Sequence, residues 1–579
     1  MIIYEVVVKN FRGIKNMLWN PNGLISCLVG PGDSNKTTIL DAIELALYPR
    51  WNVTFYDVDF YKVNVNEPIE IQVTLGNIPD ELLTEDKYGL YKRGWRSREG
   101  IIDEPNGEGS ECEAVLSISL KVGSDLEPKW SVITDRHTEG VSISWRDRAR
   151  LGLVRLGAEV NRDFAWSKFS VLTRLCGDLT EIEAILADAH RKLREAIKSD
   201  SMERLLQAAK EVESAAKRFG VNPINKYEPR LDSRFVSLGM GSISLHDGEV
   251  PLMAAGLGTR RLIALAIQRA AIPAGAIVLI DEIEHGLEPH RIRRLIRSLK
   301  RGFHAEAGGS AKEEPNFGQI IFTTHTTTPI LELDSNDLNI VRISEQGETI
   351  IKSVPAELQG IVRYMPHAIL GRKCVICEGE TEVGLCWGLE DYWQSKNNGE
   401  SVACKGVEFI SGEGSAAPKR AKLLCNLGFQ VAYFGDSDKA LDPSETELKA
   451  AGIEVILWEG KAAIEDRLAA DLPLEFLQEM VAMVISNKDL ASVASSISAE
   501  GKISKPDQDL EKLQSWLDYG WDEGALRMAI GKAAKRNKWF KSVNDGKSLA
   551  KVIVDSIPKI EKSDTFSKLR RLEGWCYGR

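Results

Sequence analysis

The sequence predicts an α/β fold in two successive units, and three observations support this. An apolar strand runs through a tight turn into a helix in "CLVGPGDSNKTTILDAIELAL", residues 27–47. A second apolar run, "GAIVLIDEIE", ends in acids, as expected for a buried parallel strand. Near residue 368 a new unit begins, in which "KCVICEGETE" and "FQVAYFGDSDKA" are two apolar strands that each end in carboxylates.

The composition predicts a folded globular protein with several domains, since 43% of the 579 residues are hydrophobic and 27% are charged. No apolar run approaches the roughly 20 residues that a membrane span needs. The start, "MIIYEVVVKNFRGIKN", lacks the basic and apolar segments of a signal peptide. We therefore expect a cytoplasmic protein with no membrane partner. Nine scattered cysteines favour free thiols, and the isolated C-x-x-C of Cys374 and Cys377 lies in a predicted strand without a second pair to form a zinc site.

The charge is unevenly distributed along the chain. The net charge is -10, but residues 531–579 contain 13 Lys and Arg against 5 Asp and Glu. This basic end indicates either a surface for a polyanion or a solvated helical tail, and charge alone does not separate the two.

The elements divide the chain into four stretches. After the first strand–helix unit, residues up to about 165 read as strands and turns, with "IEIQVTLGNIP" and "EAVLSISLKV" alternating well enough for strands. Residues 178–219 have helical periodicity and no Pro or Gly, which predicts a helical hairpin, either packed in the core or forming an arm or dimer contact. The polar, Gly-containing stretch 305–318 predicts a surface loop. We expect the chain to divide into residues 1–170, which hold the first strand–helix unit, residues 171–228, a helical insertion, residues 229–367, where strands and helices return, and residues 368–579, the second unit.

The turn after the first apolar strand is nearly the phosphate-binding loop G-x-x-x-x-G-K-[ST], with Asn35 in place of the last glycine. In such a loop, backbone N–H groups and a helix N-terminus point at the phosphate, the lysine adds charge and the hydroxyl binds Mg²⁺. Asn is among the residues that most readily adopt the left-handed conformation. The predicted nucleotide-binding residues are Gly30, Asn35, Lys36, Thr37 and Thr38.

Further parts of a nucleotide site follow in order along the chain. Asp281, at the end of "AIVLIDEIE", would hold Mg²⁺, and Glu282 would polarise the attacking water. His325, at the end of "QIIFTTHTTT", could sense the γ-phosphate. Between the phosphate loop and this acidic strand, Gly256 and Gly258 lie at a predicted helix start in "AAGLGTRRLIALAI".

Together with the opening "VVVKNFRGIKN", these parts resemble the ABC-type ATPases of the RecF and SMC-like branch. The resemblance implies a dimer of ATPase heads, in which the glycine-rich signature of one subunit closes on the nucleotide of the other. Two residues depart from the family pattern: Asn35 replaces glycine, and Ala255 stands where a serine usually contacts the γ-phosphate. Both departures imply slow hydrolysis more than they imply lost nucleotide binding.

The strand ends of the second unit predict a metal site. "VICEGETE" offers Glu378 and Glu382, and "AYFGDSDKA" offers Asp436 and Asp438. Carboxylates at strand ends suit hard divalent cations, and Asp-x-Asp directs both acids to one side of a strand. This pairing resembles the Toprim fold, and an ABC ATPase followed by a Toprim resembles the OLD (overcoming lysogenization defect) nuclease family, which includes the Gabija nuclease subunit and retron-associated nucleases.

The resemblance covers nearly the whole chain and implies a DNA endonuclease of anti-phage defence. It implies two Mg²⁺ or Mn²⁺ ions in the Toprim site and one ion with ATP. It also implies a further acid, which would be Glu465 in "LWEGKAAIEDRL", and a lysine, which would be Lys538 in "KRNKWFK", with Lys541 as the rival. Ala463 stands where the family can carry another acid. The implied partners are DNA, further copies of the chain in a homodimer or larger oligomer, and a helicase or a retron reverse transcriptase with its RNA–DNA.

Two other functions compete with a nuclease. A topoisomerase needs a tyrosine nucleophile in a separate DNA-gate domain, and a bacterial-type primase often has a zinc module, but the sequence has no zinc spacing and little chain for a gate domain. An SMC-like ATPase that holds DNA would use the Toprim as a non-catalytic scaffold. The retained acids argue against that function, and the helical stretch of roughly 40 residues is short for a coiled-coil arm.

Overall fold

The computed structural model describes most of the chain. The described residues are 1–49, 52–97, 99–103, 112–156, 164, 172, 184–189, 191–192, 203–218, 226–227, 243–270, 275–301, 318–344, 346–486, 488–504 and 512–579. Of the predicted hairpin at 178–219, the structure describes residues 184–189, residues 191–192 and α5 (Glu203–Arg218), and all of these are helical. The predicted loop at 305–318 lies almost wholly outside them. None of the described helices is long and apolar enough to cross a membrane.

The N-terminal part begins with an antiparallel sheet whose strand order is β2-β1-β4-β7-β5-β6, with β8 and β9 following β7. The two alternating segments that predict strands form β4 and β7, which pair with each other. The strands are β1 (Ile2–Phe11), β2 (Ile14–Trp19), β4 (Ile69–Gly76), β5 (Arg93–Arg96), β6 (Gly100–Ile102), β7 (Glu113–Val122), β8 (Pro128–Ile133) and β9 (Val141–Ser142).

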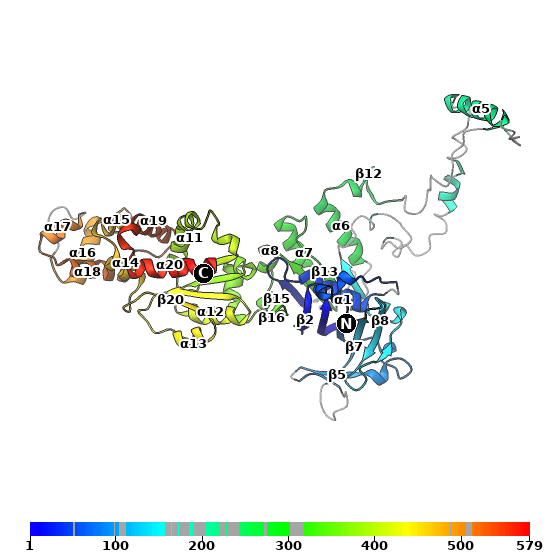
Figure 1. Ribbon diagram of the computed structural model, residues 1–579, viewed down its shortest axis with the longest axis horizontal. Coiled ribbons are helices and arrows are strands. Elements are labelled where there is room, and N and C mark those ends of the chain that lie inside the picture. Colours follow the sequence, from blue (N-terminus) through cyan, green and yellow to red (C-terminus); the bar gives the residue numbers. More distant parts are fainter. Residues whose placement is uncertain are drawn as a thin grey trace, which may run out of the picture.

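A second sheet, with order β10-β13-β14-β3-β15-β16, is parallel except for β16. Helix α1 (Lys36–Leu47) packs between the two sheets, and its buried Ile39, Leu40 and Ile43 join both of them in one core (Figure 1). The strands are β3 (Ile25–Val29), β10 (Leu153–Leu156), β13 (Ile277–Ile280), β14 (Gln319–Thr324), β15 (Leu338–Ile343) and β16 (Thr349–Ser353). The other elements of this part are α2 (Trp145–Ala149), β11 (His246–Asp247), β12 (Val250–Pro251), α6 (Leu257–Ala270), α7 (Pro289–Arg301), α8 (Thr327–Leu331), α9 (Gln359–Tyr364) and α10 (His367–Leu370).

The C-terminal unit is built on a wholly parallel sheet with order β18-β17-β19-β20. Alternate residues of its strands face two different apolar clusters, as in β17, where Val375 faces one and Ile376 the other. The strands are β17 (Lys373–Cys377), β18 (Val407–Ser411), β19 (Gln430–Gly435) and β20 (Glu454–Leu457). The helices are α11 (Glu380–Lys396), α12 (Ala417–Asn426), α13 (Glu445–Ala450), α14 (Ile464–Asp471), α15 (Leu474–Ile485), α16 (Leu490–Gly501), α17 (Leu513–Asp518), α18 (Glu523–Arg536), α19 (Val543–Ile560) and α20 (Asp564–Tyr577).

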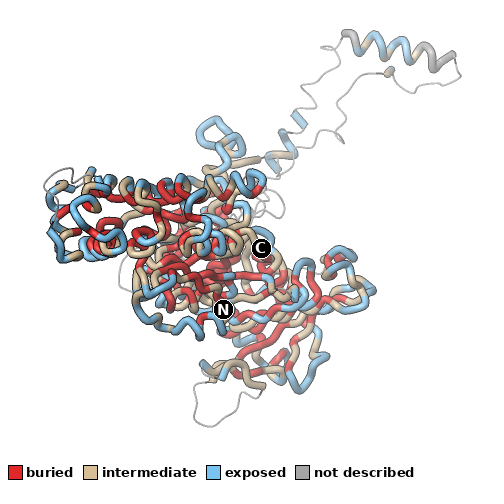
Figure 2. Tube along the Cα trace, turned by 60° about the vertical axis from the view of Figure 1, so that its left-hand side comes forward, coloured by how far each residue is buried: buried red, intermediate tan, exposed pale blue. Residues whose placement is uncertain are grey.

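The two parts share a core. One cluster of buried side chains contains Val29 and Val278 of the N-terminal part together with Ile376 and Val431 of the C-terminal sheet. At the same junction Arg342 stacks over the Phe429 ring at 3.9 Å and donates a hydrogen bond of 2.6 Å to the Gly371 carbonyl. Figure 2 shows the buried residues running through both parts. The second unit is therefore packed against the first rather than tethered to it.

The basic C-terminal region is folded, which excludes the solvated tail. Helices α18, α19 and α20 bury apolar residues such as Ile530, Ile553 and Leu572 in the core of the C-terminal unit. Much of its positive charge is also neutralised by acids from other segments. The paired cations are Lys535, Arg536, Lys541, Lys559, Lys568 and Arg571.

Helices α11 and α19 cross at glycines, and this contact holds the start of α11 in place. A Cβ atom on Gly384 would lie 2.0 Å from the Val543 carbonyl oxygen, and one on Gly546 would lie 2.1 Å from the Thr381 carbonyl oxygen. Both neighbours are backbone atoms, which cannot turn aside. Only glycine therefore allows the two helices to approach this closely.

We predict that Gly546→Ala destabilises the C-terminal unit by about 1–3 kcal/mol, because the added methyl group forces the helices apart. Thermal unfolding monitored by circular dichroism measures the effect. Gly524→Ala is the matched control, since Gly524 is exposed in the first turn of α18 and alanine is the better helix former. Equal melting temperatures for Gly546→Ala and the control would contradict the close crossing.

Candidate functional site

The phosphate loop connects β3 to α1 in the way the sequence predicts. A Cβ atom on Gly30 would lie 2.4 Å from the Val341 carbonyl oxygen, so the loop must start with glycine. Asn35 adopts φ 70° and ψ 14°, the left-handed conformation expected of it. Its Nδ2 also donates hydrogen bonds to the Gly13 carbonyl at 2.9 Å and to Thr349 Oγ1 at 3.0 Å. Asn35 therefore ties the loop to the turn after β1 and to β16, which a glycine could not do.

Lys36 is folded back into its own loop. Its Nζ donates hydrogen bonds to the carbonyls of Gly30 at 3.0 Å and Pro31 at 2.8 Å, and to Ser34 Oγ at 3.1 Å. Burial lowers the pKa of Lys36 to about 8, although Asp281 nearby opposes this effect. A phosphate group would supply the negative charge that this buried ammonium group lacks.

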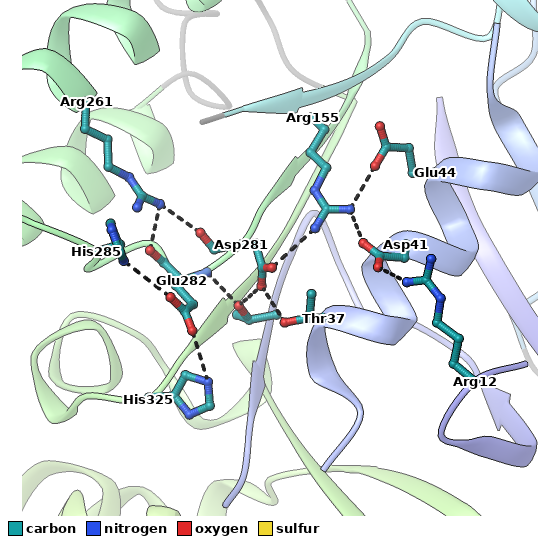
Figure 3. A network of polar contacts seen from close by, with 11 residues as sticks. Arg12, Thr37, Asp41, Glu44, Arg155, Arg261, Asp281, Glu282, His285 and His325 are labelled. Carbon is teal, nitrogen blue, oxygen red and sulfur yellow. Dashed lines mark hydrogen bonds and ion pairs between the residues drawn. The ribbon is translucent and has the colours of Figure 1, made fainter. Parts of the chain in front are cut away.

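Thr37 and Asp281 meet as a magnesium site requires. Thr37 Oγ1 donates a 3.1 Å hydrogen bond to Asp281 Oδ1, and Thr323 Oγ1 donates to the same oxygen at 2.6 Å (Figure 3). The strand order β13-β14-β3 brings the carboxyl ends of the three strands to one edge, and α1, with Thr38 beside Thr37, starts there. The hydroxyl and carboxylate oxygens are the ligand types that Mg²⁺ takes beside a nucleotide.

Glu282 and His325 also lie together at this edge. Glu282 has φ 44°, an unusual conformation for a residue with a side chain, and such conformations cluster at active sites. Its Oε1 lies 3.7 Å from His325 Nε2, and its Oε2 lies 3.5 Å from Nδ1 of His285. The structure thus pairs the predicted water-polarising glutamate with the predicted histidine and adds His285, which the sequence did not indicate.

Arg155, on β10, is a residue of this site that sequence reasoning missed. Its Nη2 lies 3.3 Å from Asp281 Oδ2, and its Nη1 lies 2.8 Å from Glu44 Oε2 and also contacts Asp41 (Figure 3). Arg12, in the turn after β1, donates to Asp41 at 2.5 Å. No local pattern marks Arg155, because only the pairing of β10 with β13 brings it to Asp281.

The two signature glycines have different surroundings. Gly256 lies immediately before α6, and a Cβ atom there would meet no atom within 4 Å. Gly258 lies in the first turn, where a Cβ atom would lie 2.3 Å from the Gly286 carbonyl oxygen. Gly258 therefore serves a close packing contact with the loop after Glu282, and Gly256 leaves an open surface at the helix start.

In the C-terminal unit, strand ends bring four carboxylates together. Glu378 follows β17, Asp436 follows β19 and Glu465 lies beyond β20, while Glu382 is in the first turn of α11. Burial, followed by the charges of the other three acids, raises the pKa of Asp436 to about 8. Burial likewise raises the pKa of Glu382 to about 7, and Glu378 and Glu465 add to the effect. The four acids therefore lie close enough to repel one another.

Backbone N–H groups hold one oxygen of several of these acids. Glu378 Oε2 accepts a hydrogen bond from Asp436 N, Asp436 Oδ1 accepts one from Ile464 N, and Glu382 Oε2 accepts one from Gly379 N, each at 2.9 Å. Within the described part of the chain, no three or more His, Cys, Asp or Glu side chains form a group that could hold a metal ion as they stand. The donor chemistry of four crowded carboxylates nevertheless fits a hard divalent cation, which would relieve their repulsion.

The remaining predicted residues are placed differently. Asp438 Oδ2 pairs with Lys535 Nζ at 2.8 Å. Lys541 Nζ lies 3.4 Å from Glu465 Oε1, whereas Lys538 is exposed with φ 51° after α18. The structure therefore brings the rival lysine to the acids. Lys535 was missed, since a lysine in a helix rich in Lys and Arg carries no distinguishing signal.

The C-x-x-C cysteines lie in β17, as predicted. Cys374 and Cys377 are both buried, and burial raises the pKa of the Cys374 thiol to about 12. They pack in different apolar clusters, Cys374 in the one shared with the N-terminal part and Cys377 in the other. This placement fits the expected structural thiols.

We predict that Asn35→Ala destabilises the N-terminal part by about 2 kcal/mol, because alanine pays for the left-handed backbone and loses the side-chain hydrogen bonds. Asn35→Gly loses only the hydrogen bonds, so its stability should lie between those of Asn35→Ala and the wild type. Thermal unfolding and ATP titration by calorimetry measure stability and affinity. A glycine variant as stable as the wild type would show that the bonds to Gly13 and Thr349 contribute nothing.

We also predict that Asp436→Asn stabilises the metal-free protein at pH 9 by on the order of 1–2 kcal/mol. Folding raises the pKa of Asp436 from 3.8 to about 8, so the folded state loses stability as the pH rises through that window. Asparagine removes the charge and keeps the acceptor for Ile464 N. Melting temperatures at pH 9 without divalent cations test this. Asp438→Asn, which breaks the pair with Lys535, is the control and should not stabilise; equal gains in both variants would refute the argument.

Comparisons with known structures and curated proteins add little about this chain. An SMC head bound to the C-terminal winged-helix domain of ScpA shows 16% identity and a TM-score of 0.34, covering 62% of this chain and 98% of that one. The Pyrococcus furiosus SMC head with an extended coiled coil, bound to the C-terminal domain of ScpA, shows 15% identity and a TM-score of 0.33, covering 61% of this chain and 96% of that one. The Thermotoga maritima SMC head shows 14% identity and a TM-score of 0.30, covering 61% of this chain and 100% of that one. These values carry no functional information about this chain. No curated protein matches the sequence.

A protein-family model, by contrast, matches just over half of the chain. It spans residues 25–328, from the strand before the phosphate loop to the segment that follows His325. Its description is "AAA domain, putative AbiEii toxin, Type IV TA system". The matched region contains the loop of Lys36, the acidic strand end of Asp281 and the histidine next to Glu282. The chain therefore belongs to this AAA-domain family, and its N-terminal part is a P-loop ATPase domain.

Proposed function

We propose that the protein is a nucleotide-regulated, divalent-metal-dependent DNA endonuclease of the OLD type. Its ATPase domain would be of the ABC type, and residues 368–579 would form a Toprim nuclease domain. The observation that carries the proposal is the meeting of Glu378, Glu382, Asp436 and Glu465 at one edge of a parallel sheet. Acids that repel one another are costly to bury, as Glu382 and Glu465 are, and such perturbed groups cluster at functional sites.

The residues around this edge suit phosphodiester hydrolysis. Divalent cations bound there would supply the positive charge that polarises the scissile phosphate. Glu465, which is 1% exposed, is positioned by the start of α14, and its partner Lys541 would face charge that develops on the phosphate. Backbone N–H groups fix one oxygen of Glu378, Glu382 and Asp436, which orients each carboxylate and leaves its other oxygen for a ligand. Asp438 would join only after leaving Lys535, and Lys538 only after its exposed side chain turned inward.

The ATPase domain would regulate cutting. Asn35 and Ala255 favour slow turnover, which suits a nucleotide sensor. The shared core between β3 and β17 gives the two domains a common body through which nucleotide binding would act. We further propose a cytoplasmic homodimer or larger oligomer that closes through the ATPase heads and the helical segment. In anti-phage defence the protein would cut DNA either without a partner, together with a helicase, or together with a retron reverse transcriptase and its RNA–DNA.

We predict that the wild-type protein cleaves supercoiled plasmid with Mg²⁺ or Mn²⁺ and that Glu378→Ala lowers cleavage at least about a hundredfold. Gel electrophoresis of the plasmid measures the nicked and linear products. Glu380→Ala is the matched control, since Glu380 is exposed two residues away and should retain activity. Lanes with and without ATP, repeated with Lys36→Ala, give the direction of regulation. Equal cleavage by the wild type and Glu378→Ala would refute the assignment of the site.

A second function, a DNA-holding ATPase with a non-catalytic C-terminal unit, is favoured by two observations. Asp438 is engaged by Lys535, and no described acidic group stands ready to hold an ion. That function predicts ATP-dependent DNA retention without cleavage, and retention unchanged in Glu378→Ala.

A further inference from the structure

Helix α7 presents a stripe of cations that neither candidate site uses. Its sequence, "PHRIRRLIRSLKR", contains six Lys and Arg and no acid. Ile292, Ile296 and Leu299 are buried and fix one side of the helix to the shared core. The other side carries an i, i+3, i+4, i+7 series, which lies on a single helical face. The members of this series, which we name the α7 stripe, are all exposed: His290, Arg293, Arg294 and Arg297.

The α7 stripe surrounds a surface hollow of about 280 Å³, lined by these same four residues. Two other cations of the helix are neutralised, since Arg291 pairs with Glu288 at 3.0 Å and Lys300 with Asp337 at 3.5 Å. Within the stripe, Arg297 also pairs with Glu332 at 2.8 Å. Arg293 and Arg294 have no acidic partner among the residues that the structure describes. Like charges at this spacing repel, and an anion in the hollow would offset the repulsion.

We propose that the α7 stripe binds the phosphate backbone of duplex DNA. The inference rests on the proposed function, in which DNA is the substrate. Guanidinium groups match phosphate oxygens with paired hydrogen bonds, and a row of cations without intervening acids fits a polyanion better than a single small anion. The protein carries a net charge of -10, so a helix with six Lys and Arg and no acid of its own is a local exception to the overall charge.

The position of α7 connects this surface to the nucleotide site. The helix begins at Pro289, shortly after Glu282, and the intervening loop passes Gly286, whose carbonyl oxygen packs against Gly258 at the start of α6. Arg291 Nη1 also donates to Thr259 Oγ1 of α6 at 3.3 Å. A shift of α7 on DNA binding would therefore reach the elements that carry Glu282 and the signature glycines.

The test measures the affinity of the full-length protein for a short fluorescent DNA duplex by fluorescence anisotropy. EDTA is present so that no cleavage occurs. Arg293→Glu/Arg294→Glu should weaken binding roughly tenfold or more and reduce the slope of log affinity against log salt by about two. Arg293→Gln/Arg294→Gln should act in the same direction with a smaller loss. Lys15→Glu/Arg146→Glu is the control, since both residues are exposed elsewhere on the ATPase domain and the charge change is identical. Unchanged ATP affinity in each variant reports intact folding.

The outcomes separate this inference from the nuclease assignment. Three results would each overturn the α7 stripe as a DNA surface. These are an equal loss of DNA affinity in the stripe and control variants, unchanged DNA affinity in the stripe variants, and no duplex binding by the wild type. Tighter binding of single-stranded RNA with the same arginine dependence would overturn DNA as its occupant. Plasmid cleavage lost in Glu378→Ala would still support the nuclease in all these cases. Stripe-dependent DNA binding without any cleavage would support the inference and reject the nuclease.

Discussion

Parallel strand pairing is the constraint on which both candidate sites depend. In a parallel sheet all strands end at the same edge, so polar residues that are far apart in the sequence are collected there. In the ATPase domain this brings Thr37, Asp281 and His325 to one edge from three separate stretches of chain. In the C-terminal unit it brings together Glu378, Asp436 and Glu465. Because both faces of such sheets must be covered, most side chains within the strands are apolar, and most of the polar side chains of the two sites lie at or just beyond the strand ends.

This constraint also explains what the sequence could predict. A buried parallel strand is an apolar run that stops at an acid or a glycine, so β3, β13, β17 and β19 could be found with their functional ends. The conformation of Asn35 followed from its residue type, because few other side chains tolerate the left-handed region. The conformation of the phosphate loop could therefore be predicted from local sequence. The meeting of the acids in the C-terminal unit could be predicted from the parallel strands alone.

The residues that could not be predicted are those that reach a site from a different element. Arg155 belongs to a short strand whose only distinction is its pairing with β13. Lys541 and Lys538 lie three residues apart in a basic segment, and the turn after α18, with Lys538 at φ 51°, decides which of them points at Glu465. Lys535 is one of several cations on α18, and its partner Asp438 comes from a distant loop. Side-chain direction at the end of a helix depends on packing, which local periodicity does not encode.

The two sites have opposite electrostatic deficits, and both oppose stability. Lys36 is a cation buried among carbonyls, and the four acids of the C-terminal unit are crowded so that the pKa values of Glu382 and Asp436 are raised. Each deficit is what a ligand of the opposite charge would remove, a nucleotide phosphate in the first case and divalent cations in the second. Ligand binding would then stabilise each domain, and by linkage the occupied states would be populated in proportion to ligand concentration. Since Val29, next to the phosphate loop, and Ile376, two residues before Glu378, pack in one close-packed cluster, a shift of β3 on nucleotide binding would reach the strand that carries the first acid. The proposed regulation of cutting by nucleotide would thus need no separate hinge, only two arrangements of this shared core.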